Sequence, residues 1–147
     1  MVIGIFGESC TGKSTIAEAL KKELNATIYS GKDYLRLHKN EAEAKKLFVD
    51  MLIEHTQKDD SIIYVISERE HLQLLPQGAI RVLVTADIDI IKERFAKRMN
   101  GNLPVPVATM LVKKHGMFDN ECCDIHIKSG EKAVDDICSE IIRKSVK

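Results

Sequence analysis

The sequence carries no excess of either charge. Its 147 residues contain 22 lysines and arginines and 22 aspartates and glutamates, so no net field draws it toward nucleic acid or an anionic membrane. No apolar run approaches the roughly 18 residues of a membrane span, and residues 1–6 lack the basic region and long apolar stretch of a secretory signal. We therefore expect a cytoplasmic protein with no nucleic-acid or membrane partner and a local phosphate site. The oligomeric state stays open.

The four cysteines, Cys10, Cys122, Cys123 and Cys138, lack the spacing of paired metal ligands. Cys122 and Cys123 are adjacent, and a disulfide between them would be strained. We interpret the cysteines as reduced thiols, mostly in or near the core, rather than as a redox or metal site.

What the chain does have is an apolar content of 44%, enough for the core of one domain over residues 1–147. The continuous apolar runs at 62–66 and 80–85 are typical of strands buried on both faces. Pro104 and Pro106 bound a segment that we expect to be mobile. The alternation of strands and helices predicts a three-layer α/β/α domain around a parallel sheet of about five strands. The expected strands are 2–6, 26–29, 62–66, 80–85 and 124–128, and the expected helical segments are 14–24, 33–38, 41–55, 69–75, 87–99 and 131–144.

The most informative stretch is GESCTGKS, Gly7 to Ser14, which matches the phosphate-binding loop, or P-loop. Gly7 lets the backbone turn sharply off the strand, and Gly12 permits close approach of an anion to successive N–H groups. Lys13 would reach the terminal phosphates, and the Ser14 hydroxyl would ligate Mg²⁺. The alternative is a glycine-rich turn that only links strand to helix. The motif predicts a nucleotide site formed by Gly7, Glu8, Ser9, Cys10, Thr11, Gly12, Lys13, Ser14 and Thr15.

Arg94 and Arg98 lie four residues apart, so on a helix they share one face and can converge on one polyphosphate. The alternative is a solvated basic face. If the loop binds a nucleotide, these arginines would complete its site, and Lys13, Arg94 and Arg98 would be the catalytic cations.

Three segments together resemble the adenylate kinase-like branch of the P-loop kinases, which includes nucleoside monophosphate kinases and several small-molecule kinases. The first is the loop itself. Residues 30–36, SGKDYLR, are similar to a stretch whose arginine holds the acceptor phosphate, which implies that role for Arg36. Residues 86–98 are similar to the helix that enters the family's lid, where two arginines contact the nucleotide; Arg94 and Arg98 match them.

The chain also departs from that family. After the strand at 62–66 the family usually has an aspartate for the magnesium shell and then an acceptor-binding arginine. Glu68 and Arg69 either take these roles or simply begin a helix. The acceptor segment, about 33–60, is short, which predicts a small or unusual acceptor. The lid, about 99–116, is short and has no arginine.

The leading hypothesis is a magnesium-dependent ATP phosphotransferase, either nucleoside monophosphate kinase-like or acting on another small molecule. Asp33 is a candidate base for a hydroxyl acceptor; with a phosphate acceptor it would orient Arg36. Arg36, Arg69 and Asp33 are the acceptor-binding candidates, and Ser14 and Glu68 are the metal candidates. The alternative is an ATP- or GTP-binding module or regulator with little or no transfer activity, because the aspartate is missing and the lid is reduced.

Overall fold

The computed structural model describes residues 1–145. No helix within that range has both the length and the apolar character needed to cross a membrane. The strands are β1 (Val2–Phe6), β2 (Thr27–Ser30), β3 (Ile62–Ile66), β4 (Ile80–Thr85) and β5 (Ile125–Lys128). The helices are α1 (Lys13–Leu24), α2 (Glu41–His55), α3 (Ile88–Arg98), α4 (Val105–Lys114) and α5 (Val134–Ser145), with 3₁₀ helices η1 (Asp33–Leu37) and η2 (Arg69–Leu74).

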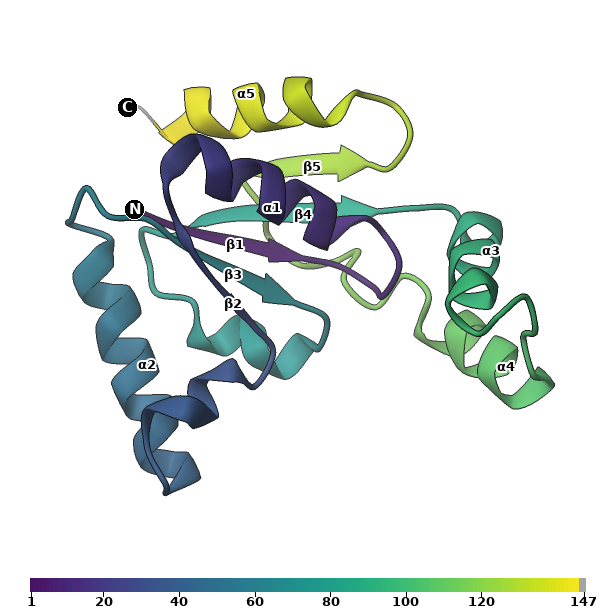
Figure 1. Ribbon diagram of the computed structural model, residues 1–147, viewed down its shortest axis with the longest axis horizontal. Helices are drawn as coiled ribbons and strands as arrows, with labels where there is room; N and C mark the ends of the chain where they lie inside the picture. The colour runs from purple at the N-terminus through teal and green to yellow at the C-terminus, as the bar shows by residue number, and fades with distance from the viewer. Residues whose placement is uncertain (146–147) are drawn as a thin grey trace.

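The five strands form one parallel sheet in the order β2-β3-β1-β4-β5. In Figure 1, α1 and α5 cover one face of the sheet, and α2 with the two 3₁₀ helices covers the other. The predicted three-layer fold with five parallel strands is confirmed. All strands point toward the same edge, and α3 and α4 stand beyond that edge as a separate arm (Figure 1). Carboxyl ends of parallel strands are the usual place for a ligand.

The burial of each strand agrees with its position in the sheet. Every residue of β1 and β3 is buried, as expected for central strands covered on both faces. β5, at one edge, alternates buried and exposed residues. One apolar cluster packs the sheet against α1 and α5, and a second packs it against α2, η1 and η2. The carboxyl end of β1 is thus held rigidly from both sides, which fixes the loop that follows it.

The segment around Pro104 and Pro106, which we expected to be mobile, is helical. It contains the ten-residue helix α4, with Pro104 just before the helix and Pro106 in its first turn. The first turn is where a helix needs no backbone N–H donors, so proline is tolerated there. Leu111 is the buried residue of α4 and packs with Ile91 of α3 in a small third cluster. The prolines therefore lie at the start of a helix, and the mobility of the segment stays a prediction.

The thiols divide evenly between core and surface. Cys10 and Cys138 are buried as expected, whereas Cys122 and Cys123 are exposed in the connection before β5. All four are free. The expectation that most of them lie in or near the core holds for two of the four.

Candidate functional site

The loop after β1 takes a shape that demands both of its glycines. The Gly7 amide donates to the Ile66 carbonyl (3.2 Å), and a side chain on Gly7 would collide with the Val84 carbonyl of the neighbouring strand. Gly12 has a φ of 100° at the start of α1, a conformation that side chains disfavour. Cys10 between them also has a positive φ, 65°. The loop therefore bends tightly between β1 and α1 and presents its backbone at the helix N-terminus, where an anion is favoured.

Lys13 lies almost entirely inside the loop, with 5% of its surface exposed. Its ammonium group donates to the Glu8 carbonyl (2.5 Å), which also accepts from the Thr11 hydroxyl (2.9 Å). Burial lowers the pKa of Lys13 to about 8, with Arg98 adding to the decrease and Cys10 and Glu8 opposing it. Burying the charged ammonium group away from water costs free energy, and the negative charge of a bound polyphosphate would offset that cost.

Two cavities meet at the loop. The larger, about 480 Å³, lies between the loop, α3 and the connection from β5 to α5. The smaller, about 130 Å³, lies beside Lys13 and Ser14 and reaches the end of β3 at Ser67. Both are lined by Cys10, Gly12, Thr15 and Arg98. The larger has the size of a small-ligand site and mixes apolar with polar walls, which suits a nucleoside next to a phosphate cradle.

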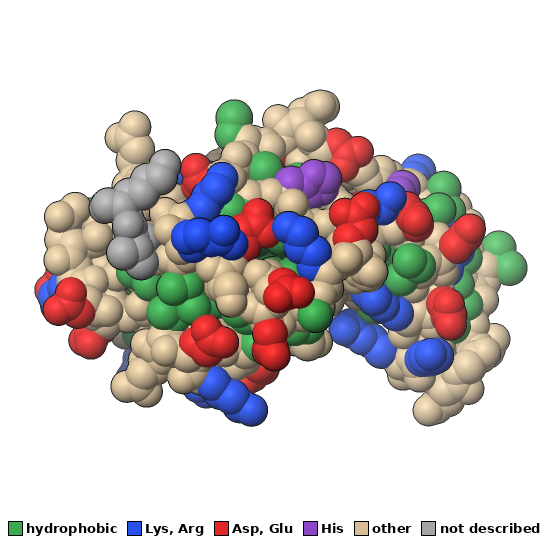
Figure 2. Space-filling model, turned by 90° about the horizontal axis from the view of Figure 1, so that it is seen from above, with side chains coloured by type: hydrophobic (Ala, Val, Ile, Leu, Met, Phe, Trp, Pro, Cys, Tyr) green, Lys and Arg blue, Asp and Glu red, His purple; other side chains and the backbone are tan. Residues whose placement is uncertain are grey.

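Arg94 ties three distant parts of the chain together. One of its guanidinium nitrogens donates to the Cys10 carbonyl (3.0 Å) and the other to the Ser129 hydroxyl (3.0 Å). Arg98, one turn later on α3, lines both cavities. The structure therefore brings both arginines to the loop. Figure 2, which looks down on this side, shows Lys and Arg side chains beside the notch between the arm and the rest of the molecule.

Ser129 was not among the sequence candidates. It follows β5 at the carboxyl edge of the sheet, where its amide also donates to the Thr85 carbonyl (2.8 Å). The available signal was its position directly after a predicted strand, because polar residues at carboxyl ends of parallel strands gather at one edge.

The Glu8 side chain faces the arm. Its carboxylate is nearly buried and accepts from the His115 ring (3.0 Å) and the Gly116 amide (3.1 Å), just after α4. Only the backbone of Glu8 serves the loop, through the carbonyl that Lys13 contacts. The carboxylate instead fastens the end of α4 to the phosphate loop.

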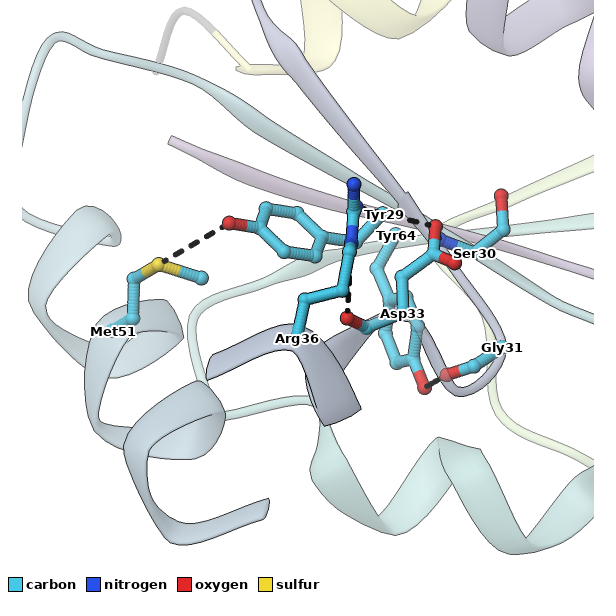
Figure 3. Close-up of polar contacts among 7 residues, drawn as sticks. All are labelled: Tyr29, Ser30, Gly31, Asp33, Arg36, Met51 and Tyr64. Atoms are coloured by element: carbon cyan, nitrogen blue, oxygen red, sulfur yellow. Dashed lines mark hydrogen bonds and ion pairs between the residues drawn. The ribbon is translucent and has the colours of Figure 1, made fainter. Parts of the chain in front are cut away.

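Asp33 and Arg36 lie together on η1, after β2 (Figure 3). The Asp33 carboxylate accepts from the Ser30 amide (2.8 Å) and pairs with Arg36 (3.7 Å). The Arg36 guanidinium also lies over the Tyr29 ring, 5.9 Å from its centroid. The two residues therefore form one charge-paired unit at the carboxyl end of β2.

Glu68 and Arg69 each have another partner. Glu68 pairs with Lys114 at the end of α4 (3.8 Å), and Arg69 pairs with Glu121 (3.2 Å). Arg69 and Glu121 line a cavity of about 350 Å³ apart from the two at the loop. Ser67 and Ser14, rather than Glu68, line the smaller cavity at the loop.

The donor set around the loop fits a magnesium ion that arrives with its nucleotide. Mg²⁺ is held by one or two protein groups and the substrate phosphates and keeps several waters. The Ser14 hydroxyl beside Lys13 meets that need. Within residues 1–145 there is no cluster of three or more acidic, histidine or cysteine side chains that could hold an ion alone.

No protein-family model matches the sequence, and no curated protein is similar to it. Solved structures do resemble it. Shikimate kinase from Bacteroides thetaiotaomicron is 14% identical, with 98% of this chain and 97% of that chain covered and a TM-score of 0.66. The tunicamycin resistance protein from Deinococcus radiodurans is 17% identical, with 99% and 95% covered and a TM-score of 0.66. A gluconokinase from Sinorhizobium meliloti is 13% identical, with 98% of this chain and 90% of that chain covered and a TM-score of 0.61.

At these identities the likeness concerns the fold. It agrees with the fold that the resemblance seen in the sequence implies, and the nucleoside monophosphate kinase branch stays a prediction. The chain has the three-layer fold of the P-loop kinases.

Proposed function

We propose that the protein is an ATP-dependent phosphotransferase that moves a terminal phosphoryl group to a small acceptor. The observation that carries this proposal is the set of cations around the two joined cavities. Lys13, Arg94 and Arg98 surround them, and within residues 1–145 no carboxylate lies within 4.0 Å of these three. In a chain with no net charge, unpaired cations at a helix N-terminus favour a polyanion.

Phosphoryl transfer requires mainly positioning and charge neutralisation, and each residue of the site has a part in it. The loop amides and Lys13 hold the β- and γ-phosphates. The Ser14 hydroxyl would hold the Mg²⁺ that accompanies the nucleotide, and the ion, when bound, would supply charge that neutralises the phosphates. Arg94 and Arg98 reach the site from the arm and stabilise charge on the migrating group. Glu68 is at most an indirect metal residue in this scheme, because it pairs with Lys114.

The acceptor enters from the β2–β3 side, where η1 and η2 follow the strands. Asp33, Arg36 and Arg69 are the residues proposed to face it, within or next to the segment of residues 33–60. Residues 99–116, including α4, are proposed to act as the lid, because their end is fastened to the loop through Glu8. Nucleoside monophosphates and other small hydroxyl compounds are both acceptor classes to test.

The test compares two neighbouring residues of α3. Arg98→Ala should lower kcat for acceptor-stimulated ADP release by about 100-fold, as expected for the loss of a charge that stabilises the transition state, with a smaller effect on ATP affinity. Lys97→Ala is the matched control, because Lys97 is exposed and pairs with Glu93 on the surface of α3. Its activity should stay near that of the unmodified protein.

The same assay addresses the nucleotide-binding module. A protein that binds ATP tightly by calorimetry, yet releases no ADP with any acceptor, is a binding module or regulator and not a phosphotransferase. Equal activity of the Arg98→Ala and Lys97→Ala variants would show that Arg98 has no part in transfer.

A further inference from the structure

A carboxylate and an imidazole are paired beside the phosphate loop. The His115 ring, just after α4, donates from Nδ1 to one oxygen of the Glu8 carboxylate (3.0 Å), and the Gly116 amide donates to the other oxygen (3.1 Å). The Glu8 side chain is 10% exposed, whereas the His115 side chain is 38% exposed. The nearly buried carboxylate is thus held by two donors, while the ring that it holds stays accessible from outside.

The contacts of Glu8 decide which ring nitrogen of His115 is able to accept a proton. A carboxylate only accepts hydrogen bonds, so the ring nitrogen that faces it, Nδ1, carries the hydrogen. In the neutral ring the free lone pair then lies on the other nitrogen, Nε2. Within residues 1–145 Nε2 makes no hydrogen bond. The pair therefore has the arrangement of a general base whose proton-accepting nitrogen is free.

Glu8 also connects this ring to the cation of the phosphate loop. The Glu8 carbonyl accepts from the Lys13 ammonium group, and the Glu8 carboxylate accepts from the His115 ring. A single glutamate residue therefore separates the imidazole from the ammonium group that is proposed to hold the terminal phosphates. The imidazole lies next to the place where phosphoryl transfer is proposed to occur.

The ring lies on the side of the loop opposite to the larger cavity. The strands are ordered β2-β3-β1-β4-β5, and the larger cavity is lined by Val84 of β4 and Ile127 of β5. Lys114, the neighbour of His115 in the chain, instead pairs with Glu68 (3.8 Å), which comes shortly after β3. With a nucleoside in the larger cavity and its phosphates on the loop after β1, the ring is beyond the phosphates. An in-line displacement brings the acceptor to that side.

We infer that His115 is the general base of the proposed phosphotransferase and that Glu8 is its positioning residue. The inference rests on that proposed function and requires an acceptor that reacts through a hydroxyl group. The acceptor oxygen bonds to the γ-phosphorus while the bond from that phosphorus to the β–γ bridging oxygen breaks. The hydroxyl proton passes to Nε2 of His115, and ADP leaves with the bridging oxygen. The imidazolium, paired with the Glu8 carboxylate, then releases the proton to water.

Asp33 is the other candidate base, and it has different surroundings. Its carboxylate accepts from the Ser30 amide (2.8 Å) and pairs with Arg36 (3.7 Å). These contacts hold the carboxylate on η1, where it can orient an acceptor. Imidazole is the side chain most often used for general base catalysis near neutral pH. Asp33 is therefore assigned to acceptor binding, and His115 to proton transfer.

The experiment uses a substitution that separates the two ring nitrogens. The amide nitrogen of asparagine and Nδ1 of histidine are both attached to Cγ, so His115→Asn keeps a donor to Glu8 and removes Nε2. Nucleosides, aldoses and polyols are offered with ATP and Mg²⁺, and ADP release is measured. With the best acceptor, His115→Asn should lower kcat by at least about 100-fold and change the acceptor KM by less than about 3-fold. The Tm and the ATP affinity should not change, because the contact with Glu8 is retained.

A second variant tests whether Glu8 acts through the proton of the ring. In Glu8→Gln the amide oxygen must face the Gly116 N–H, so the NH₂ group faces Nδ1 of His115. The ring hydrogen then moves to Nε2, and the lone pair that receives the proton is lost. The kcat should fall by at least about 10-fold with little change in KM.

His126→Asn is the matched control. His126 is an exposed residue of the edge strand β5, and its ring contacts the Thr85 hydroxyl (2.8 Å). It lines neither cavity at the loop. The same substitution there should leave kcat within about 2-fold of that of the unmodified protein.

The outcomes separate the inference from the phosphotransferase proposal. An unchanged kcat in either His115→Asn or Glu8→Gln overturns the inference and leaves the proposal intact. A larger loss of kcat in Asp33→Asn than in His115→Asn does the same, as does transfer to nucleoside monophosphates alone, because an ionised phosphate acceptor needs no base. ATP binding without acceptor-stimulated ADP release overturns the phosphotransferase proposal, and the inference with it.

Discussion

Replacing Lys13 by methionine should stabilise the nucleotide-free protein while abolishing its nucleotide binding. Methionine is an unbranched apolar side chain of similar length, so it can occupy the same nearly buried space. The Glu8 carbonyl keeps a donor, because the Thr11 hydroxyl also reaches it at 2.9 Å. The substitution therefore removes the buried charge without leaving an unpaired polar group.

The expected gain follows from the pKa of Lys13. In the folded protein that pKa is lowered from 10.5 to about 8 by burial. A lysine with a lowered pKa binds fewer protons when folded than when unfolded between these two values, so stability rises with pH in this window. Below pH 8 the full cost of burying the charge applies, and a shift of this size corresponds to roughly 3 kcal/mol.

The assay is urea unfolding without nucleotide at pH values from 6.5 to 10. At pH 7 the free energy of unfolding of the Lys13→Met variant should exceed that of the unmodified protein by about 2–3 kcal/mol. The difference should shrink as the pH rises from 8 toward 10.5. Lys22→Met, at an exposed position late in α1, is the control and should show no pH-dependent gain. Equal stabilities at pH 7, or a difference independent of pH, would refute the reasoning.

Three other substitutions test the site. Arg94→Ala removes donors to Cys10 and Ser129 and should lower ATP affinity by about 10- to 100-fold by calorimetry, since hydrogen bonds from charged groups contribute about 1.5–3 kcal/mol. Gly7→Ala meets the Val84 carbonyl and should lower the free energy of unfolding by more than about 2 kcal/mol in urea. Glu8→Ala frees the end of α4 and should speed amide hydrogen exchange there by about 10-fold.

Each of these substitutions has a control at a nearby position. Lys92→Ala, also on α3, should leave ATP affinity unchanged; a similar loss would show that Arg94 acts only through helix stability. Gly4→Ala meets the Leu75 side chain, which can rotate, so it should cost less than Gly7→Ala. Ser9→Ala, in the same loop as Glu8, should not change amide hydrogen exchange in α4. If it does, the contacts of the Glu8 carboxylate are not what holds the end of α4 to the loop.

The strands and the phosphate loop could be predicted because their signals are local. The apolar run Ile62–Ile66 matches β3 residue for residue, and the glycine spacing of the loop fixes its backbone shape. Helix α4 was missed because the same two prolines can interrupt a chain or begin a helix. What decides between these outcomes is the packing of Leu111 against Ile91, a contact between residues twenty positions apart that the segment's own composition does not reveal.

The ion-pair partners of the candidate site residues could not be predicted from the sequence, because they are set by the tertiary structure. The pattern that pointed to Glu68 and Arg69 could not say that Lys114 and Glu121 would come to lie beside them. Equal numbers of acidic and basic residues imply only that any field is local. The fold determines where opposite charges meet. Among residues 1–145 it leaves Lys13, Arg94 and Arg98 without a carboxylate partner, while it pairs Arg36, Arg69, Lys114 and His115. Lys13, Arg94 and Arg98 are therefore candidates for binding phosphate because they are unpaired and also lie beside the N-terminus of α1, a combination that the sequence spacing alone could not establish.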